Sequence, residues 1–383
     1  MPHDLSPDDR AEIARRRAAR AARAAGAALR DARSQQTIGT AVRQPRLQDL
    51  AEPRAAPHTP SSRVLVGRND WLFLCNDSND VIGQHTGRVR LAPAVLENWS
   101  ALTSARLELM ERRGISWLCA IVPDKEAIYS EFLPPEIVLA ERRPVHALLD
   151  IAADLDAPFL YLHDALQAAK AKMPLYPITG THWNHLGAYT GYRAICSQYQ
   201  KAGVELPVLS HDSIEWQQYQ VADDLGRKLE PKQFGASVLA KVANQRARMV
   251  FDNRIMNRGR TVIFEREDGE GPRGVVFADS FAPYLLLFLK ESFCRLVFVH
   301  THAMPEEILE REKPDCVLSL TAERFIVRVP ADATAMWQIH ETVRSRRDRG
   351  EMVENVQWVY HSIPGAAEVR NDGELPWPSD DSS

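Results

Sequence analysis

The sequence has 383 residues, of which 45% are hydrophobic and 26% are charged. This balance is typical of a globular protein and excludes a largely disordered chain. The formal net charge of −4 gives no electrostatic reason for a nucleic-acid partner, and we expect none. The five cysteines include no Cys-x-x-Cys pair, which argues against a disulfide framework and against a structural zinc site.

The chain begins with a basic segment. Residues 6 to about 33 are predicted to form a helix, because Ser6 and Pro7 suit its first positions and alanines and arginines follow. Such a helix can contact a protein partner or an anionic membrane surface, or it can stay solvated. Residues 34–60 are rich in Pro, Gln, Ser and Arg and are predicted to be a linker. We therefore expect residues 1–60 to be a unit of their own.

The start of the chain also bears on its location. It has acids and arginines where a signal peptide needs an apolar core. No stretch of the sequence reaches the roughly 18 apolar residues that a membrane span needs. These two observations predict a cytoplasmic protein.

From residue 64 onward, apolar runs and helical patterns alternate. Two short apolar runs, 64–66 and 71–74, predict a hairpin. Continuous apolar runs predict buried strands at 115–122, 158–163, 274–278, 295–300 and 315–320. Helical patterns predict helices at 93–113, 145–155, 164–172, 186–202, 283–293, 305–312 and 332–348. This alternation predicts an α/β domain with a mainly parallel sheet and helices on both faces.

Two segments depart from the alternation. Residues 205–272 mix polar helical stretches with strand-like runs, and we expect an insertion made of a helix and a small antiparallel piece. Residues 323–330 are expected to form an edge strand. The domain is predicted to span residues 61–365, with the insertion before the strand at 274–278, and residues 366–383 to form an acidic tail.

Ser280 is the first candidate for chemistry. It follows the predicted strand at 274–278 and Asp279, and a helix begins shortly after it. In parallel sheets the chemistry lies at the carboxyl ends of strands, and free N–H groups at a helix start can stabilise a developing oxyanion. A serine hydroxyl is a weak nucleophile that needs a neighbouring base. The alternative is that Ser280 and Asp279 only cap the helix.

His182 is the second candidate. It lies in a loop rich in turn formers, directly before a helix that Asn184 can cap. An imidazole that titrates near neutral pH is the obvious base for Ser280. The alternative is a histidine that only ties down its loop, with Trp183 packed beneath it.

Several short motifs around these residues occur in an order that resembles a known family. They are WLFL at 71–74, VPDKEAIYSEFLP at 122–134, YPITGTHWNHLGA at 176–188, DDLGRKL at 223–229 and VVFADSF at 275–281. Together they resemble the SGNH-hydrolase-like domain of the alginate O-acetyltransferase (AlgX/AlgJ-like) family. The resemblance covers about residues 64 to 330. It implies a three-layer α/β sandwich and a protein that works outside the cytoplasmic membrane, in conflict with the cytoplasmic prediction.

The resemblance also implies roles for the two candidates. Ser280 matches the nucleophile that takes up the acyl group, and His182 matches the general base and acid. The family's acidic residue stands two positions before the histidine, where this chain has Gly180. Three alternatives stay open: a Ser-His dyad oriented by a backbone carbonyl, a substitute acid such as Asp164 or Asp279, or a domain that binds a glycan without turning it over.

Further residues are candidates for supporting the pair. Asp279, Asp164 and Lys125 are polar residues at predicted strand ends, and Trp183 adjoins the histidine. His300 and His302 are separated by one residue, but no acid or thiol stands at a fitting spacing, so we expect no metal and no cofactor.

The function implied by the resemblance is acyl transfer through a serine acyl-enzyme to a cell-surface polysaccharide or its precursor. The acyl donor stays unknown. Transfer to water would make the protein a carbohydrate esterase, and a degenerate site would make it a glycan-binding or assembly protein.

Overall fold

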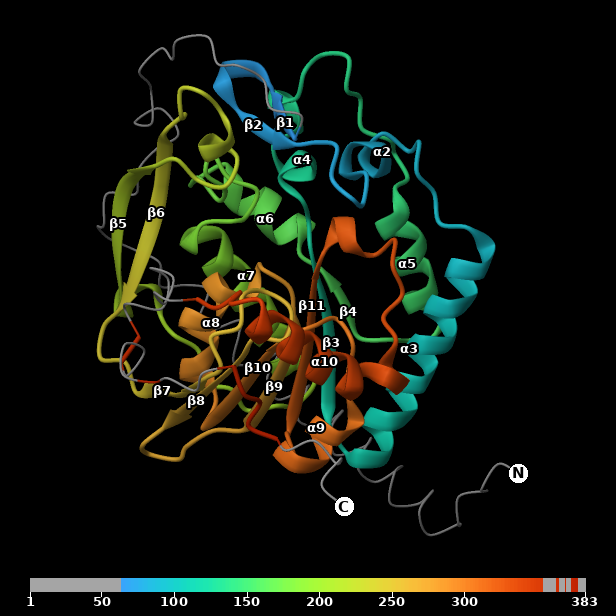
Figure 1. Cartoon of the computed structure of the whole chain (residues 1–383), viewed down its shortest axis with the longest axis vertical. Coiled ribbons are helices and arrows are strands. Elements are labelled where there is room, and N and C mark those ends of the chain that lie inside the picture. The colour runs from blue at the N-terminus through green and yellow to red at the C-terminus, as the bar shows by residue number, and fades with distance from the viewer. Residues whose placement is uncertain (1–62, 354–362, 365–368, 370–372, 378–383) are drawn as a thin grey trace.

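The computed structural model describes residues 63–353, 363–364, 369 and 373–377. The predicted basic helix and linker over residues 1–60 lie outside these residues, as does most of the predicted acidic tail. The described part is built around one central sheet with helices on both faces (Figure 1). Among the described residues, no helix is both long enough and apolar enough to cross a membrane.

The central sheet has seven strands in the order β4-β3-β11-β9-β10-β8-β7. Its first five strands are parallel to one another: β4 (Phe159–Tyr161), β3 (Ser116–Val122), β11 (Cys316–Ala322), β9 (Arg273–Ala278) and β10 (Arg295–His300). The last two strands, β8 (Thr261–Arg266) and β7 (Ala247–Asp252), run antiparallel to their neighbours. The sheet is therefore mainly parallel, as predicted, with an antiparallel extension at one edge.

Both faces of the sheet are apolar because its central strands are buried on both sides. In β9, Val276 and Ala278 join one hydrophobic cluster, whereas Val275 and Phe277 join another. The first cluster includes side chains of α6 (His163–Lys170), α7 (His185–Lys201) and α8 (Ala282–Leu289). Side chains of α3 (Pro93–Arg113), α5 (Pro144–Asp154), α9 (Glu306–Glu312) and α10 (Ala335–Asp348) cover the other face. The fold is a three-layer α/β sandwich, as predicted.

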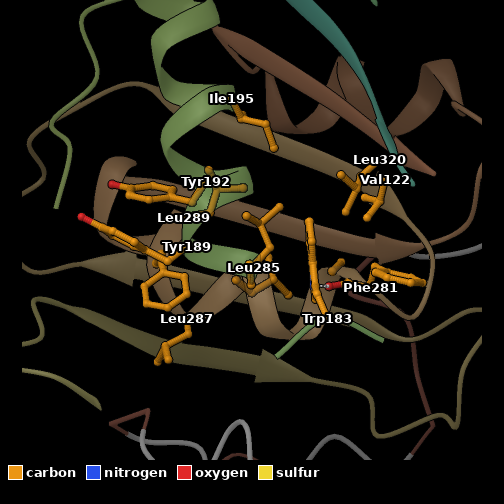
Figure 2. Close-up of a cluster of buried hydrophobic side chains, with 14 of the residues drawn as sticks. Val122, Trp183, Tyr189, Tyr192, Ile195, Phe281, Leu285, Leu287, Leu289 and Leu320 are labelled. Atoms are coloured by element: carbon orange, nitrogen blue, oxygen red, sulfur yellow. Dashed lines mark hydrogen bonds between the residues drawn. The ribbon is translucent and has the colours of Figure 1, made fainter. Parts of the chain in front are cut away.

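The layer of α7 and α8 contains the aromatic part of the core. Figure 2 shows Trp183, Tyr189 and Tyr192 gathered with leucines of α8 and with Phe281. Trp183 and Tyr192 are fully buried, and the Trp183 ring packs edge-on against Phe281 with their centroids 5.6 Å apart. This packing joins the start of α7 to the start of α8, two segments that are about a hundred positions apart in the chain.

Two hairpins and two short helices complete the described fold. The predicted hairpin forms from β1 (Val64–Val66) and β2 (Leu72–Leu74). A second hairpin, β5 (Ile214–Val221) with β6 (Gly235–Val242), flanks the sandwich beside α7 (Figure 1). The short helices are α2 (Val81–His85) and α4 (Lys125–Ile128).

The segment 205–272 differs from the prediction. In place of a helix it has only two 3-10 turns, His211–Ser213 and Gly226–Lys228. Half of the segment forms the β5-β6 hairpin, and the other half supplies β7 and β8 to the central sheet. The segment is therefore partly an insertion and partly a component of the main fold, because β8 pairs with β10 and β7 pairs with β8.

Residues 323–330 do not form the predicted edge strand. They begin with a 3-10 turn at Glu323–Phe325 that follows β11 directly. Glu323 and Arg324 are both buried, and each has an ion-pair partner: Arg143 for Glu323 and Asp124 for Arg324. The turn lets both side chains reach these partners, which an extended strand would not. The edge strand of the sheet next to β3 is therefore β4.

Candidate active site

Ser280 lies at the carboxyl end of β9, in the turn that leads into α8. The preceding Asp279 holds this turn in place. One of its carboxylate oxygens accepts the N–H of Phe281 at 2.9 Å, and the other accepts the N–H of Ala322, at the end of β11, at 2.7 Å. Burial raises the pKa of Asp279, but His302 and these two N–H groups lower it more, to about 2. Asp279 is thus an ionised, buried anchor of the serine turn.

His182 faces Ser280 from the loop between α6 and α7. Its Nε2 atom lies 2.7 Å from the Ser280 Oγ atom. The next residues of each segment are also joined, because the Trp183 indole N–H donates to the carbonyl oxygen of Phe281 at 3.0 Å (Figure 2). Asn184 caps α7, its side-chain oxygen accepting two backbone N–H groups of the first turn. The distance from imidazole to hydroxyl is that of a nucleophile and its base.

Lys125 anchors the loop that carries His182. The side chain is buried, and its ammonium donates to the carbonyl oxygens of Pro177, Ile178 and Gly180 at 3.0, 3.0 and 2.6 Å. Burial lowers the pKa of Lys125 to about 8, although the nearby carboxylates oppose this shift. These contacts of Lys125 are with the backbone of the loop, so the lysine holds in place the segment that leads to His182.

Asp164 stands apart from the pair. Its side chain is fully exposed in the first turn of α6 and contacts its neighbour, the His163 Nδ1 atom, at 3.0 Å. Among the hydrogen bonds of the described residues, none joins Asp164 or Asp279 to His182. The two acids considered as substitutes for the one missing at Gly180 therefore do not bond the imidazole, because one faces solvent and the other is committed to the serine turn.

Two acids that sequence reasoning missed lie behind His182, on the segment that follows β5. Asp224 accepts the backbone N–H of Thr181 at 2.7 Å and the Thr181 hydroxyl at 2.8 Å. The same hydroxyl oxygen lies 3.2 Å from the His182 Nδ1 atom. Asp223 fills the space beside Gly180, where an added Cβ atom would come within 2.7 Å of its carboxylate oxygen. The only signal in the sequence was the DDLGRKL motif, which names no role for either acid.

The charges around His182 act in opposite directions. Burial lowers the pKa of the imidazole, Asp224 raises it and Arg324 lowers it, and the net direction is downward. A lowered pKa keeps the ring neutral at neutral pH, which is the state that can accept a proton. The lowering also follows the direction expected for a base held in a poorly solvated loop.

A cavity of about 330 Å³ reaches Ser280. Its wall includes Ser280 and Asp279 from the serine turn, His300 and His302 from the end of β10, and residues of α10. Two exposed arginines, Arg258 and Arg328, also line it. His182 is not among the residues that line the cavity, although its imidazole contacts the same Ser280 hydroxyl.

A comparison with known families finds a match for much of the domain. Residues 64–251 match the model of the SGNH hydrolase-like domain of acetyltransferase AlgX. Over these residues the chain is similar to the SGNH hydrolase-like domain of the AlgX/AlgJ-like family. The match includes His182 of this AlgX/AlgJ-like domain and ends before Ser280. The evidence that Ser280 belongs to the same site therefore comes from the structure and not from the family model.

Individual relatives agree with this assignment. The domain is 28% identical over 137 residues to the probable alginate O-acetylase AlgJ of Pseudomonas aeruginosa, and 26% identical over 146 residues to that of Pseudomonas putida. These alignments cover 35% and 34% of this chain and 32% of each relative. The chain thus spans about a third of the length of the curated relatives it matches.

Two solved structures share the fold. PatB1 of Bacillus cereus superimposes with a TM-score of 0.52 at 14% identity, over 70% of this chain and 99% of PatB1. A DHHW family protein from Eubacterium siraeum gives a TM-score of 0.50 at 14% identity, over 75% of this chain and 98% of the other. At this identity the likeness establishes the fold.

The relatives overturn the predicted cytoplasmic location. That prediction rested on the residues at the start of the sequence, whereas the AlgJ relatives are periplasmic alginate-modifying proteins. As evidence for location, the similarity of the domain to these relatives outweighs the composition of the first residues of the chain.

Proposed function

We propose that the AlgX/AlgJ-like domain is an O-acetyltransferase that works through an acyl-enzyme on Ser280. The observation that supports this most directly is the 2.7 Å contact between the Ser280 Oγ atom and the His182 Nε2 atom at the carboxyl ends of parallel strands. The hydroxyl is activated by the imidazole and is open to the cavity. The acyl group is then held where an acceptor can reach it.

The first half of the reaction forms the acyl-enzyme. The Ser280 oxygen attacks the carbonyl carbon of an acetyl donor while its proton passes to the His182 Nε2 atom. The tetrahedral oxyanion needs hydrogen-bond donors. We assign one to the backbone N–H of Ser280, which donates none of the hydrogen bonds found among the described residues. The intermediate collapses, the bond to the leaving group breaks, and the leaving group takes the proton from His182.

The second half transfers the acetyl group. A hydroxyl of the acceptor gives its proton to the His182 Nε2 atom and attacks the acetyl carbon on Ser280. The bond to the Ser280 oxygen breaks, and His182 returns the proton to that oxygen. Water in place of the acceptor would give acetate, so the same residues can serve an esterase, and exclusion of water decides between the two.

The acceptor is proposed to be a polysaccharide of the alginate type. The relatives named for this activity are probable alginate O-acetylases. In this chain the support comes from Arg258 and Arg328, which line the cavity and can pair with sugar carboxylates. We propose the predicted division of the chain as well, with the domain over residues 61–365 and the basic segment before it available for a partner or a membrane surface.

The test is acetyl transfer in solution. Purified protein is incubated with p-nitrophenyl acetate as acetyl donor and with oligosaccharides from alginate, and the sugars are weighed by mass spectrometry. The proposal predicts oligosaccharides heavier by an acetyl group, and none with Ser280→Ala. Release of acetate alone would make the protein an esterase, and no reaction above the Ser280→Ala control would leave a glycan-binding protein.

A further inference from the structure

The loop of His182 is hydrogen-bonded to the segment that follows β5. Thr179 donates its hydroxyl to the carbonyl oxygen of Val221 at 3.0 Å. Its own carbonyl oxygen accepts the N–H groups of Leu225 and Gly226 at 3.1 and 2.9 Å. These bonds fix residues 223 and 224 against residues 179–182, although some 40 positions separate the two segments. Asp223 and Asp224 therefore lie against the loop that carries His182.

The two ring nitrogens of His182 have different partners. Nε2 lies 2.7 Å from the Ser280 hydroxyl, and as the base that takes the serine proton it must be unprotonated, which leaves the ring proton on Nδ1. Nδ1 then donates to the Thr181 hydroxyl oxygen at 3.2 Å. The Thr181 hydroxyl in turn donates to Asp224 at 2.8 Å. The hydrogen bonds run in one direction, from Ser280 to the Asp224 carboxylate.

Asp223 explains why position 180 is a glycine. Any side chain at position 180 would run into the Asp223 carboxylate at 2.7 Å and into the Pro177 ring at 2.9 Å. Gly180 and Asp223 therefore fill one space between them, and an acid at position 180 is excluded while Asp223 is present. Asp223 also accepts the backbone N–H of Asp224 at 2.8 Å, which holds the neighbouring carboxylate under Thr181.

We infer that Asp224, acting through the Thr181 hydroxyl, takes the place of the acid that this chain lacks at Gly180. Asp224 and Thr181 are positioning residues: they fix the tautomer of His182 and stabilise the imidazolium that forms when it takes the serine proton. This inference rests on the proposed acyl transfer and adds to it the source of the third member.

The charges that face His182 make the inference measurable by pH. Asp223 and Asp224 face it from the segment after β5, Asp279 from the end of β9 and Arg324 from the turn after β11. The three carboxylates raise the pKa of His182, whereas Arg324 and burial lower it. Removing the charge of Asp224 must lower the pKa of His182 further, so the rise of kcat/KM with pH must move to lower pH.

The experiment measures p-nitrophenyl acetate hydrolysis against pH for wild type, Asp224→Asn, Thr181→Val and Thr181→Ser. Loss of a directly bonded acid costs about 10⁴-fold in a serine protease. Because a hydroxyl intervenes here, we expect Asp224→Asn to lower kcat/KM about 10- to 100-fold. Thr181→Val should lower it to a similar extent, and Thr181→Ser, which keeps the hydroxyl, should not. Asp212→Asn, an exposed acid at the start of the same hairpin, is the matched control.

A rescue separates positioning from folding. In the Asp224→Asn background, Gly180→Asp combined with Asp223→Ala returns an acid to the family position and removes the carboxylate nearest to it, so that only the Pro177 ring has to shift. Recovery of activity together with a shifted pH profile in Asp224→Asn supports the inference. Equal activity of Asp224→Asn and wild type overturns it, and so does a uniform loss at every pH without rescue. Ser280→Ala in parallel tells the two proposals apart, because activity without Ser280 overturns the acyl-enzyme itself.

Discussion

The serine turn and the histidine loop are held in place in different ways. The turn around Ser280 is fixed by its own neighbour, since Asp279 binds Phe281 next to it and the adjacent strand β11. The loop around His182 is fixed by residues far from it in the chain, by Lys125 at the start of α4 and by Asp224 after β5. A local anchor can be read in a short motif, whereas a remote anchor exists only once the chain has folded.

The largest effect should come from breaking the remote anchor. Lys125→Met removes the buried donor of three carbonyl groups, which costs about 3 kcal/mol of the free energy of unfolding. It also frees the loop, and a misplacement of about 1 Å can lower kcat/KM about 10²-fold. Thermal unfolding and p-nitrophenyl acetate hydrolysis measure both.

The control for this variant is Lys172→Met, which changes an exposed lysine near the same loop. It should resemble wild type. If Lys125→Met kept wild-type kcat/KM, the loop would hold His182 without its remote anchor, and the comparison between the two segments would fail.

Breaking the local anchor should mainly affect stability. Asp279→Asn leaves a buried N–H of Phe281 or Ala322 without its carboxylate acceptor, at a cost of about 1–3 kcal/mol. Because Asp279 does not bond His182, kcat/KM per folded molecule should fall less than in Lys125→Met. Denaturant unfolding beside active-site titration measures this, with the exposed Asp348→Asn as control. A greater loss of kcat/KM than in Lys125→Met would reverse the comparison.

The same contrast explains what the sequence could predict. Apolar runs and helical patterns predicted the parallel strands and the helices around them, because burial on both faces makes a strand continuously apolar and burial on one face gives a helix a periodic pattern. The strand-turn-helix around Ser280 and the capped loop of His182 were likewise local patterns. Their contact was expected from the family order, and the structure brings them to 2.7 Å.

The rest depended on contacts that no local pattern encodes. Thr181 and Asp224 lie 43 positions apart, and the docking of the β5-β6 hairpin beside α7 and the hydrogen bonds of Thr179 bring them together. The sequence of residues 323–330 predicts a strand, but its first residues form a turn in which Glu323 and Arg324 make buried ion pairs. In both cases a side chain's distant partner decides the structure.

The smallest effect should follow from Asp164→Asn. The side chain is fully exposed and contacts only His163 among the described residues, and surface substitutions of this kind change stability by less than about 0.5 kcal/mol. We expect wild-type hydrolysis and a wild-type melting temperature. A clear loss of kcat/KM would mean that Asp164 serves the site after all.

The central claim is that Ser280 carries the acyl group. The most direct test is to quench the protein during reaction with p-nitrophenyl acetate and to weigh its peptides by mass spectrometry. The account predicts one acetyl group on the peptide that contains Ser280, slower acetylation in His182→Ala and none in Ser280→Ala. Acetyl on another residue, or equal hydrolysis by wild type and Ser280→Ala, would contradict it.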